Sequence, residues 1–132
     1  MREKGEGLSL GVVVRKQESH QTVSLKNNRG TMTKLINAEV GSKNIDLHVN
    51  RIRPKSDVGL YHYHEYMENV YFILEGEITI RTPEGNKVVR KDEAAFIPPG
   101  VPHAVLNLQD VEAQVLEIYS PCRQNDFVVV DE

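Results

Sequence analysis

Residues 59–76 read Gly-Leu-Tyr-His-Tyr-His-Glu-Tyr-Met-Glu-Asn-Val-Tyr-Phe-Ile-Leu-Glu-Gly. Aromatic and β-branched residues are frequent here, which favours strands over helices. Residues two apart on a strand project from the same face, so the side chains of His62 and His64 can converge on one point. Neutral imidazole is the commonest metal ligand in proteins, and two imidazoles on one face provide half of a metal site. The apolar run Val70–Leu74 predicts a strand that anchors this half-site to a core.

The remainder of the chain has the pattern of many short strands separated by turns. Apolar or alternating runs of strand length are bounded by glycine, proline and asparagine, and no segment keeps a helical period over three turns. This pattern predicts an all-β sandwich or barrel. The expected strands are residues 8–14, 31–36, 45–52, 70–74, 76–81, 87–90, 94–97, 103–108, 111–119 and 127–130.

Composition narrows the class of protein. The 132 residues predict one domain with a single core, and the net charge of −3, spread without long runs of one sign, argues against a nucleic-acid-binding surface. Cys122 is the only cysteine, so an intramolecular disulfide is excluded. Residues 1–7 are polar, are expected to be flexible and lack the apolar core of a signal peptide. No apolar run approaches the roughly 20 residues of a membrane helix. We therefore expect a cytoplasmic protein that binds neither nucleic acid nor membranes.

A second stretch, residues 92–107, carries another histidine in a distinctive setting. It ends in the pattern Pro-x-Gly-x-x-His-x-x-x-Asn, which Pro98, Gly100, His103 and Asn107 match without a gap. Proline fixes φ and glycine permits conformations that other residues avoid, so residues 98–100 predict a rigid turn before the histidine.

Together, residues 59–76 and 92–107 resemble the two sequence motifs of the cupin superfamily, whose members are small β-barrels of the jelly-roll type. His62, His64 and Gly76 fit the first motif well, although Gly59 stands nearer the histidine pair than the usual first glycine. Asp92-Glu93 replaces the Gly-Asp that usually opens the second motif. The motifs cover about a quarter of the chain. The resemblance implies a single jelly-roll barrel over residues 1–132.

The resemblance also implies one divalent transition-metal ion inside the barrel mouth, bound by His62, His64 and His103. Three imidazoles leave open coordination positions for water or substrate, as in a catalytic rather than a structural site. Such a nitrogen and oxygen ligand set suits iron, manganese, nickel, zinc or copper and does not select among them by affinity.

The sequence leaves the fourth ligand open between two residues. Counted back from Gly76, the family's glutamate ligand falls on Asn69, with Glu68 directly before it. Strand alternation places these two side chains on opposite faces, and both faces of the strand are largely apolar. If Asn69 faces inward, the fourth ligand is a weak amide oxygen or is missing. A local bulge would instead bring the Glu68 carboxylate to the metal.

Other polar residues on the expected strands are candidates for a pocket beside the metal. Tyr71 is the tyrosine that we expect to line the substrate pocket. His48 is expected to be a hydrogen-bonded strand histidine, with a place in the pocket as the alternative. Glu117 stands alone in an apolar strand and is a candidate pocket carboxylate. Asn107, the last residue of the second motif, is expected to stabilise a turn.

The function implied by the resemblance is a metal-dependent enzyme of the isomerase, lyase or dioxygenase type that acts on a small polar metabolite. The alternatives are a non-catalytic module that senses a metal or small ligand, and a metal-free barrel used for assembly. The resemblance also implies a homodimer, since single-domain cupins usually pair through their sheets. The apolar segments Leu8–Val14 and Phe127–Val130 are candidate exchanged or edge strands.

Overall fold

The computed structural model describes residues 11–17, 22–57 and 59–131. Within these residues, the regular structure is mainly β-strands, with the short 3₁₀ helices η3 (Lys26–Asn28) and η4 (Ala38–Val40) between them. The expectation that residues 1–7 are flexible lies outside the described residues. The strands are β1 (Thr22–Ser24), β2 (Gly30–Ile36), β3 (Asp46–Ile52), β4 (His62–Tyr63), β5 (Glu68–Glu75), β6 (Glu77–Thr82), β7 (Gly85–Arg90), β8 (Ala94–Ile97), β9 (Ala104–Leu106), β10 (Ala113–Ser120) and β11 (Val128–Val129).

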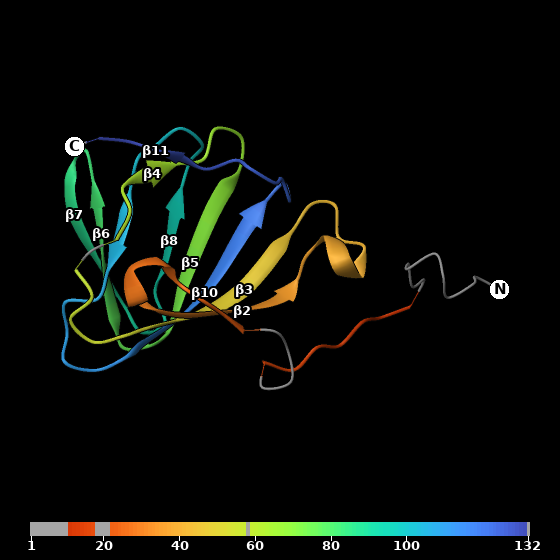
Figure 1. Cartoon of the computed structure of the whole chain (residues 1–132), viewed down its shortest axis with the longest axis horizontal. Helices are drawn as coiled ribbons and strands as arrows, with labels where there is room; N and C mark the ends of the chain where they lie inside the picture. Colours follow the sequence, from red (N-terminus) through yellow and green to blue (C-terminus); the bar gives the residue numbers. More distant parts are fainter. Residues whose placement is uncertain (1–10, 18–21, 58, 132) are drawn as a thin grey trace.

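The strands form antiparallel sheets that face one another (Figure 1). A six-stranded sheet has the order β1-β2-β3-β10-β5-β8, a three-stranded sheet has the order β7-β6-β9, and β11 pairs with β4. Neighbours such as β3 and β10 are far apart in the sequence, so the chain crosses repeatedly between the two layers, as in Greek-key sandwiches. The prediction of an all-β fold is confirmed.

The interior between the sheets is apolar at one end and polar at the other. Inward-facing residues alternate along β5, where Asn69, Tyr71 and Ile73 are buried. The neighbouring strand β10 places Val115 opposite Ile73 and Glu117 opposite Tyr71. The aliphatic end joins the core cluster, in which residues of both sheets pack together. The polar end is where a functional site can form, because its buried polar groups need partners.

Gly76 makes the sharp connection from β5 to β6 possible. Its φ is +79°, and a Cβ added there would lie 2.8 Å from the carbonyl oxygen of Glu112. Both the left-handed conformation and the close approach of a neighbouring backbone exclude larger residues. This is the physical reason for a glycine at the end of the first motif.

The structure corrects residues 11–14 of the expected strand Leu8–Val14, whose first three residues lie outside the described residues. Residues 11–14 form no strand, and Val12 is 93% exposed. Both edges of β2 are already occupied, by β1 and β3, so this apolar run has no partner there. The sequence reading missed β1, whose short polar sequence carries no strand signal. Phe127–Val130 does contain a strand, limited to Val128–Val129.

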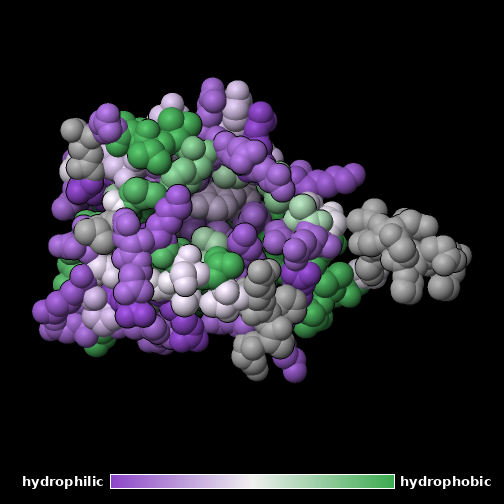
Figure 2. All heavy atoms as spheres, in the orientation of Figure 1, coloured by the Kyte–Doolittle hydropathy of each residue, from purple (hydrophilic) through white to green (hydrophobic). Residues whose placement is uncertain are grey.

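The outer surface shows hydrophobic residues only in small groups among hydrophilic ones on the face drawn in Figure 2. Single exposed apolar side chains are common on folded proteins and need no special explanation. In the part of the chain that the structure describes, no helix has the length and apolar character needed to cross a membrane.

Candidate metal centre

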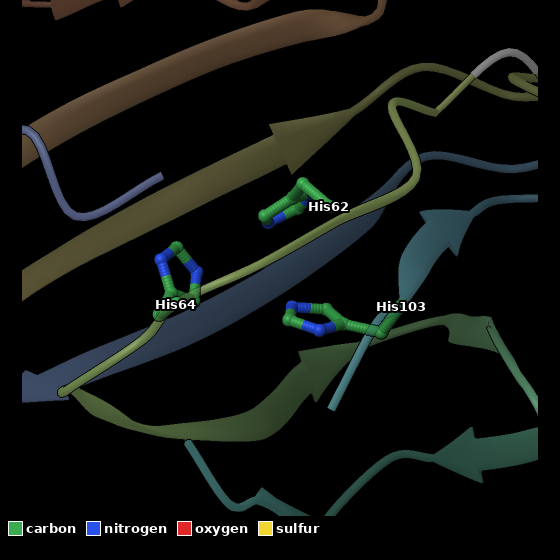
Figure 3. Close-up of side chains that lie close together, drawn as sticks. All are labelled: His62, His64 and His103. Atoms are coloured by element: carbon green, nitrogen blue, oxygen red, sulfur yellow. The ribbon is translucent and has the colours of Figure 1, made fainter. Parts of the chain in front are cut away.

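Three histidines come together near Tyr71, at the polar end of the interior (Figure 3). His62 lies on β4, His64 directly follows it, and His103 directly precedes β9. The backbones of His62 and His103 pair, since the N–H of each donates to the carbonyl of the other, at N···O distances of 3.0 and 2.8 Å. The N–H of Gly100 donates to the carbonyl of His64 at 2.7 Å, so the proline-glycine turn holds the second stretch against the first.

Backbone carbonyls fix the orientation of all three imidazole rings. Nδ1 of His62 lies 2.8 Å from the carbonyl oxygen of Leu60, Nδ1 of His64 lies 2.6 Å from that of Asp126, and Nδ1 of His103 lies 2.9 Å from that of Val101. A carbonyl oxygen only accepts, so each Nδ1 carries the proton and each Nε2 carries a free lone pair. This arrangement is typical of histidines that bind a metal through Nε2.

Two of the three free nitrogens are buried and have no hydrogen-bond partner within the protein. Nε2 of His64 and Nε2 of His103 are buried without a hydrogen bond, which is costly in a folded interior. The three potential ligand atoms lie within 4.8 Å of one another. Two nitrogens about 2.1 Å from one ion are roughly 3–3.4 Å apart, so small ring movements complete the site.

The surroundings of two of the three histidines favour the neutral imidazole. Burial, assisted by the neighbouring His103 and His64, lowers the pKa of His62 to about 4. Burial also lowers the pKa of His103, with a contribution from His64. Neutral imidazoles are the form that binds metals, so the residues present fit a divalent transition-metal ion.

The two candidate fourth ligands lie on opposite sides of β5. Glu68 is exposed, whereas Asn69 is fully buried. Nδ2 of Asn69 donates to Oε2 of Glu117 at 3.0 Å and to the carbonyl of Ile118 at 3.2 Å. These two hydrogen bonds use both of its protons and fix the amide orientation, which leaves Oδ1 buried without a partner. Of the two residues, only Asn69 therefore offers an oxygen to the interior.

Glu117 is the centre of a buried polar cluster beside the histidines. Its Oε1 accepts hydrogen bonds from Nε2 of His48 at 2.8 Å and from Nδ2 of Asn50 at 2.7 Å. On the outer side, Nδ1 of His48 lies 3.2 Å from Oδ1 of Asp46. Burial opposes ionisation of both partners, but their mutual attraction prevails. The pKa of Glu117 falls well below its usual range, and the pKa of His48 rises to about 9.

This ion pair predicts a loss of stability at alkaline pH. A folded-state pKa of about 9 against 6.5 unfolded means that the stabilisation by His48 is fully present below about pH 6.5 and is lost as the pH rises through 9. The shift corresponds to roughly 3–3.5 kcal/mol. We expect the free energy of unfolding, from urea titrations at pH 6.5, 8 and 9.5, to fall more in the wild type than in His48→Gln. Parallel pH profiles of the two proteins would contradict the ion pair.

A cavity of about 240 Å³ opens beside the cluster and reaches the molecular surface (Figure 2). Tyr71, the expected pocket residue, lies on its wall. Burial and the charge of Glu117 raise the pKa of Tyr71 well above its usual value, so its hydroxyl stays protonated. Residues of several distant segments share this wall, including Arg29, Asn50, His62, Tyr71, Glu117 and Phe127.

The C-terminal segment contributes residues that the sequence reading missed. The Asp126 carboxylate accepts hydrogen bonds from the backbone N–H groups of Glu65, Tyr66 and Met67 at 2.5–2.9 Å. These bonds lower its pKa even though burial opposes the shift. The ring of Phe127 stacks on His62 with a centroid distance of 4.2 Å. The local sequence assigns neither residue to the site, because their partners lie about 60 residues earlier in the chain.

The two remaining predicted residues, Asn107 and His48, make hydrogen bonds within the protein. Asn107 is buried, donates to the carbonyls of Ile52 and Val111 and accepts from the N–H of Gln109, so it stabilises a turn as expected. His48 is hydrogen-bonded within its strand layer, as described above.

Comparisons with known proteins identify the family to which this chain is similar. A family profile described as "Cupin domain" matches residues 48–119. The uncharacterized protein MJ1618 of Methanocaldococcus jannaschii is 30% identical over 81 residues, which cover 61% of this chain and 65%, less than two thirds, of that protein.

Two solved structures share the fold. The polyketide cyclase RemF from Streptomyces resistomycificus superposes with a TM-score of 0.80 at 22% identity, over 92% of this chain and 87% of that chain. A sugar phosphate isomerase of the cupin superfamily from Silicibacter pomeroyi superposes with a TM-score of 0.70 at 17% identity, over 80% of this chain and 73% of that one. The profile match spans more than half of the sequence, and the chain therefore belongs to the cupin family.

Proposed function

We propose that this cupin is a metal-dependent enzyme that acts on a small polar metabolite at one divalent transition-metal ion held by His62, His64 and His103. The observation that carries the proposal is the orientation of the imidazoles. All three donate Nδ1–H to a backbone carbonyl, and at least two of the Nε2 atoms are buried with no partner in the protein. A protein that did not bind a ligand there would carry this cost without compensation.

Asn69 is the fourth residue of the proposed site. Its free Oδ1 can bind the ion weakly or accept a hydrogen bond from a water molecule on it. The imidazoles and this amide contribute no negative charge, so they leave the full charge of the ion to polarise a substrate. Such an ion supplies Lewis-acid or oxygen-activating chemistry, which isomerases, lyases and dioxygenases use.

The other cavity residues prepare the environment of the reacting group. Phe127 covers one face of His62 and limits access of water from that side. Tyr71 hydrogen-bonds to the Glu117 carboxylate through its protonated hydroxyl, which leaves the hydroxyl oxygen as an acceptor for the substrate. The cavity is smaller than the 300–1,000 Å³ of typical ligand pockets, which favours a metabolite of a few carbon atoms.

The structural neighbours support an enzyme but not a particular reaction. One is named a polyketide cyclase and another a sugar phosphate isomerase, so this fold accommodates different chemistries. The metal identity is part of the proposal only as a member of the group iron, manganese, nickel, zinc and copper, because the ligand types do not discriminate among them.

Turnover by metal-loaded protein tests the proposal. We expect conversion of at least one compound in a panel of small hydroxy acids, keto acids and sugar phosphates, and a loss of at least about 100-fold in His103→Ala, since removal of a ligand exceeds the usual effect of its supporting residues. Glu68→Gln is the matched control, because Glu68 is exposed on the other face of the neighbouring strand. Stoichiometric metal with no turnover across the panel would contradict the enzyme and favour a ligand-sensing module.

A further inference from the structure

Arg29 is a cation on the cavity wall that is attracted by the charge of Glu117 but makes no direct ion pair with it. It follows η3, and its Nη2 donates to the carbonyl oxygen of Val105 at 2.9 Å. Its Nε is buried and makes no hydrogen bond. Among the described residues, no carboxylate forms an ion pair with it. A buried guanidinium N–H without an acceptor is unfavourable, so Arg29 is poised for a ligand rather than satisfied by the protein.

The one carboxylate on the same wall is already neutralised. Glu117 is paired with the protonated His48 and also accepts hydrogen bonds from Asn50 and Asn69. This pair carries no net charge, whereas Arg29 carries a full positive charge. Lys26 adds a second cation to the cavity lining. The cavity therefore has a positive balance before any metal ion is counted, which favours an anionic ligand.

We propose that Arg29 binds the carboxylate of the substrate, so that the metabolite handled at the histidine cluster is a small organic acid. Arg29 and His62 line the same cavity, which allows one molecule to reach both the guanidinium and the metal. Guanidinium groups bind carboxylates through charge-assisted, planar hydrogen bonds, and the free Nε–H provides one donor for such a bond. The small volume of the cavity favours a short-chain acid over a larger phosphorylated sugar. This inference rests on the proposed function and names its substrate class.

Calorimetric titration with glycolate and glycolamide tests the role of Arg29. The two probes share a hydroxyl group and differ in charge. We expect zinc-loaded wild type to prefer glycolate, and Arg29→Gln to weaken glycolate binding by about 10- to 100-fold without changing glycolamide binding. Arg53→Gln is the matched control, because it removes the same charge from an exposed neighbour and is expected to change binding less than about twofold. Equal loss for both probes, or equal effects of both substitutions, would overturn the proposal.

Two further measurements test whether the ligand of Arg29 is a carboxylate. Inorganic phosphate that binds more tightly than glycolate, with the same dependence on Arg29, would overturn the assignment to a carboxylate. Arg29→Lys keeps the charge but not the planar fork, so it is expected to lose part of the glycolate affinity and serves as the readout if Arg29→Gln does not fold.

The failure of this inference can be told apart from the failure of the metal site. On metal-free protein, Arg29 still supplies the positive charge. We therefore expect the metal-free protein to keep a reduced preference for glycolate over glycolamide, and we expect Arg29→Gln to abolish this preference. If the protein binds no metal but keeps its preference for glycolate, the proposed function alone would be contradicted. If the protein binds metal normally and Arg29→Gln leaves its glycolate affinity unchanged, this inference alone would be contradicted.

Discussion

Protein purified without an affinity tag or chelator is expected to contain close to one transition-metal ion per chain. His103→Ala is expected to retain almost none, because the two remaining imidazoles, His62 and His64, bind far more weakly than three that converge. Elemental analysis by inductively coupled plasma mass spectrometry measures both, and apo protein reconstituted with zinc gives the affinity ratio. We expect the zinc affinity of the wild type to exceed that of His103→Ala by more than 10- to 100-fold, which is the typical loss when a residue hydrogen-bonded to a metal ligand is replaced.

Substitutions on the two faces of β5 serve as internal controls for this measurement. Glu68→Gln changes an exposed side chain and is expected to leave the metal content unchanged. Asn69→Leu removes the unpartnered Oδ1 and is expected to lower metal affinity less than His103→Ala does, since a neutral amide oxygen is a weak ligand. A wild type that binds no transition metal even after reconstitution would contradict the metal site and, with it, the enzyme.

The three histidines could be predicted from sequence because local rules place them. A two-residue spacing on a strand puts His62 and His64 on one face, and a proline-glycine turn sets the position of His103. The strand rhythm likewise follows from short apolar runs between turn residues, which is why most of the expected strands coincide with observed ones.

The choice between Glu68 and Asn69 could not be made from the sequence because both faces of β5 are largely apolar. In the structure, the choice depends on β10, some 48 residues away, where Glu117 accepts the Asn69 amide. Arg29 was missed for the same kind of reason. Its turn precedes β2, and only the tertiary fold brings it to the cavity that His62 lines. Contacts between segments that are far apart in the sequence produce no local sequence pattern from which they could be predicted.

Removal of the buried carboxylate in Glu117→Ala is expected to destabilise the protein by about 3–5 kcal/mol, because it leaves the protonated His48 and the amides of Asn50 and Asn69 without an acceptor. For a chain of this length, the melting temperature should fall by roughly 10–20 °C. Differential scanning calorimetry at pH 7 measures the change. The exposed Glu112→Ala is the matched control and should shift stability by less than about 1 kcal/mol.

A double-mutant cycle separates the ion pair from the packing around it. If the cost arises from an unpaired buried charge, replacement of both partners in Glu117→Gln/His48→Gln should cost less than the sum of the single substitutions. Additive costs would contradict the pairing.

Glu117→Gln is also expected to weaken metal binding, because its amide can no longer hold Asn69 with Oδ1 free. The stability of the fold and the geometry of the metal centre would then depend on the same buried carboxylate, which explains why an acidic residue lies in an otherwise apolar strand.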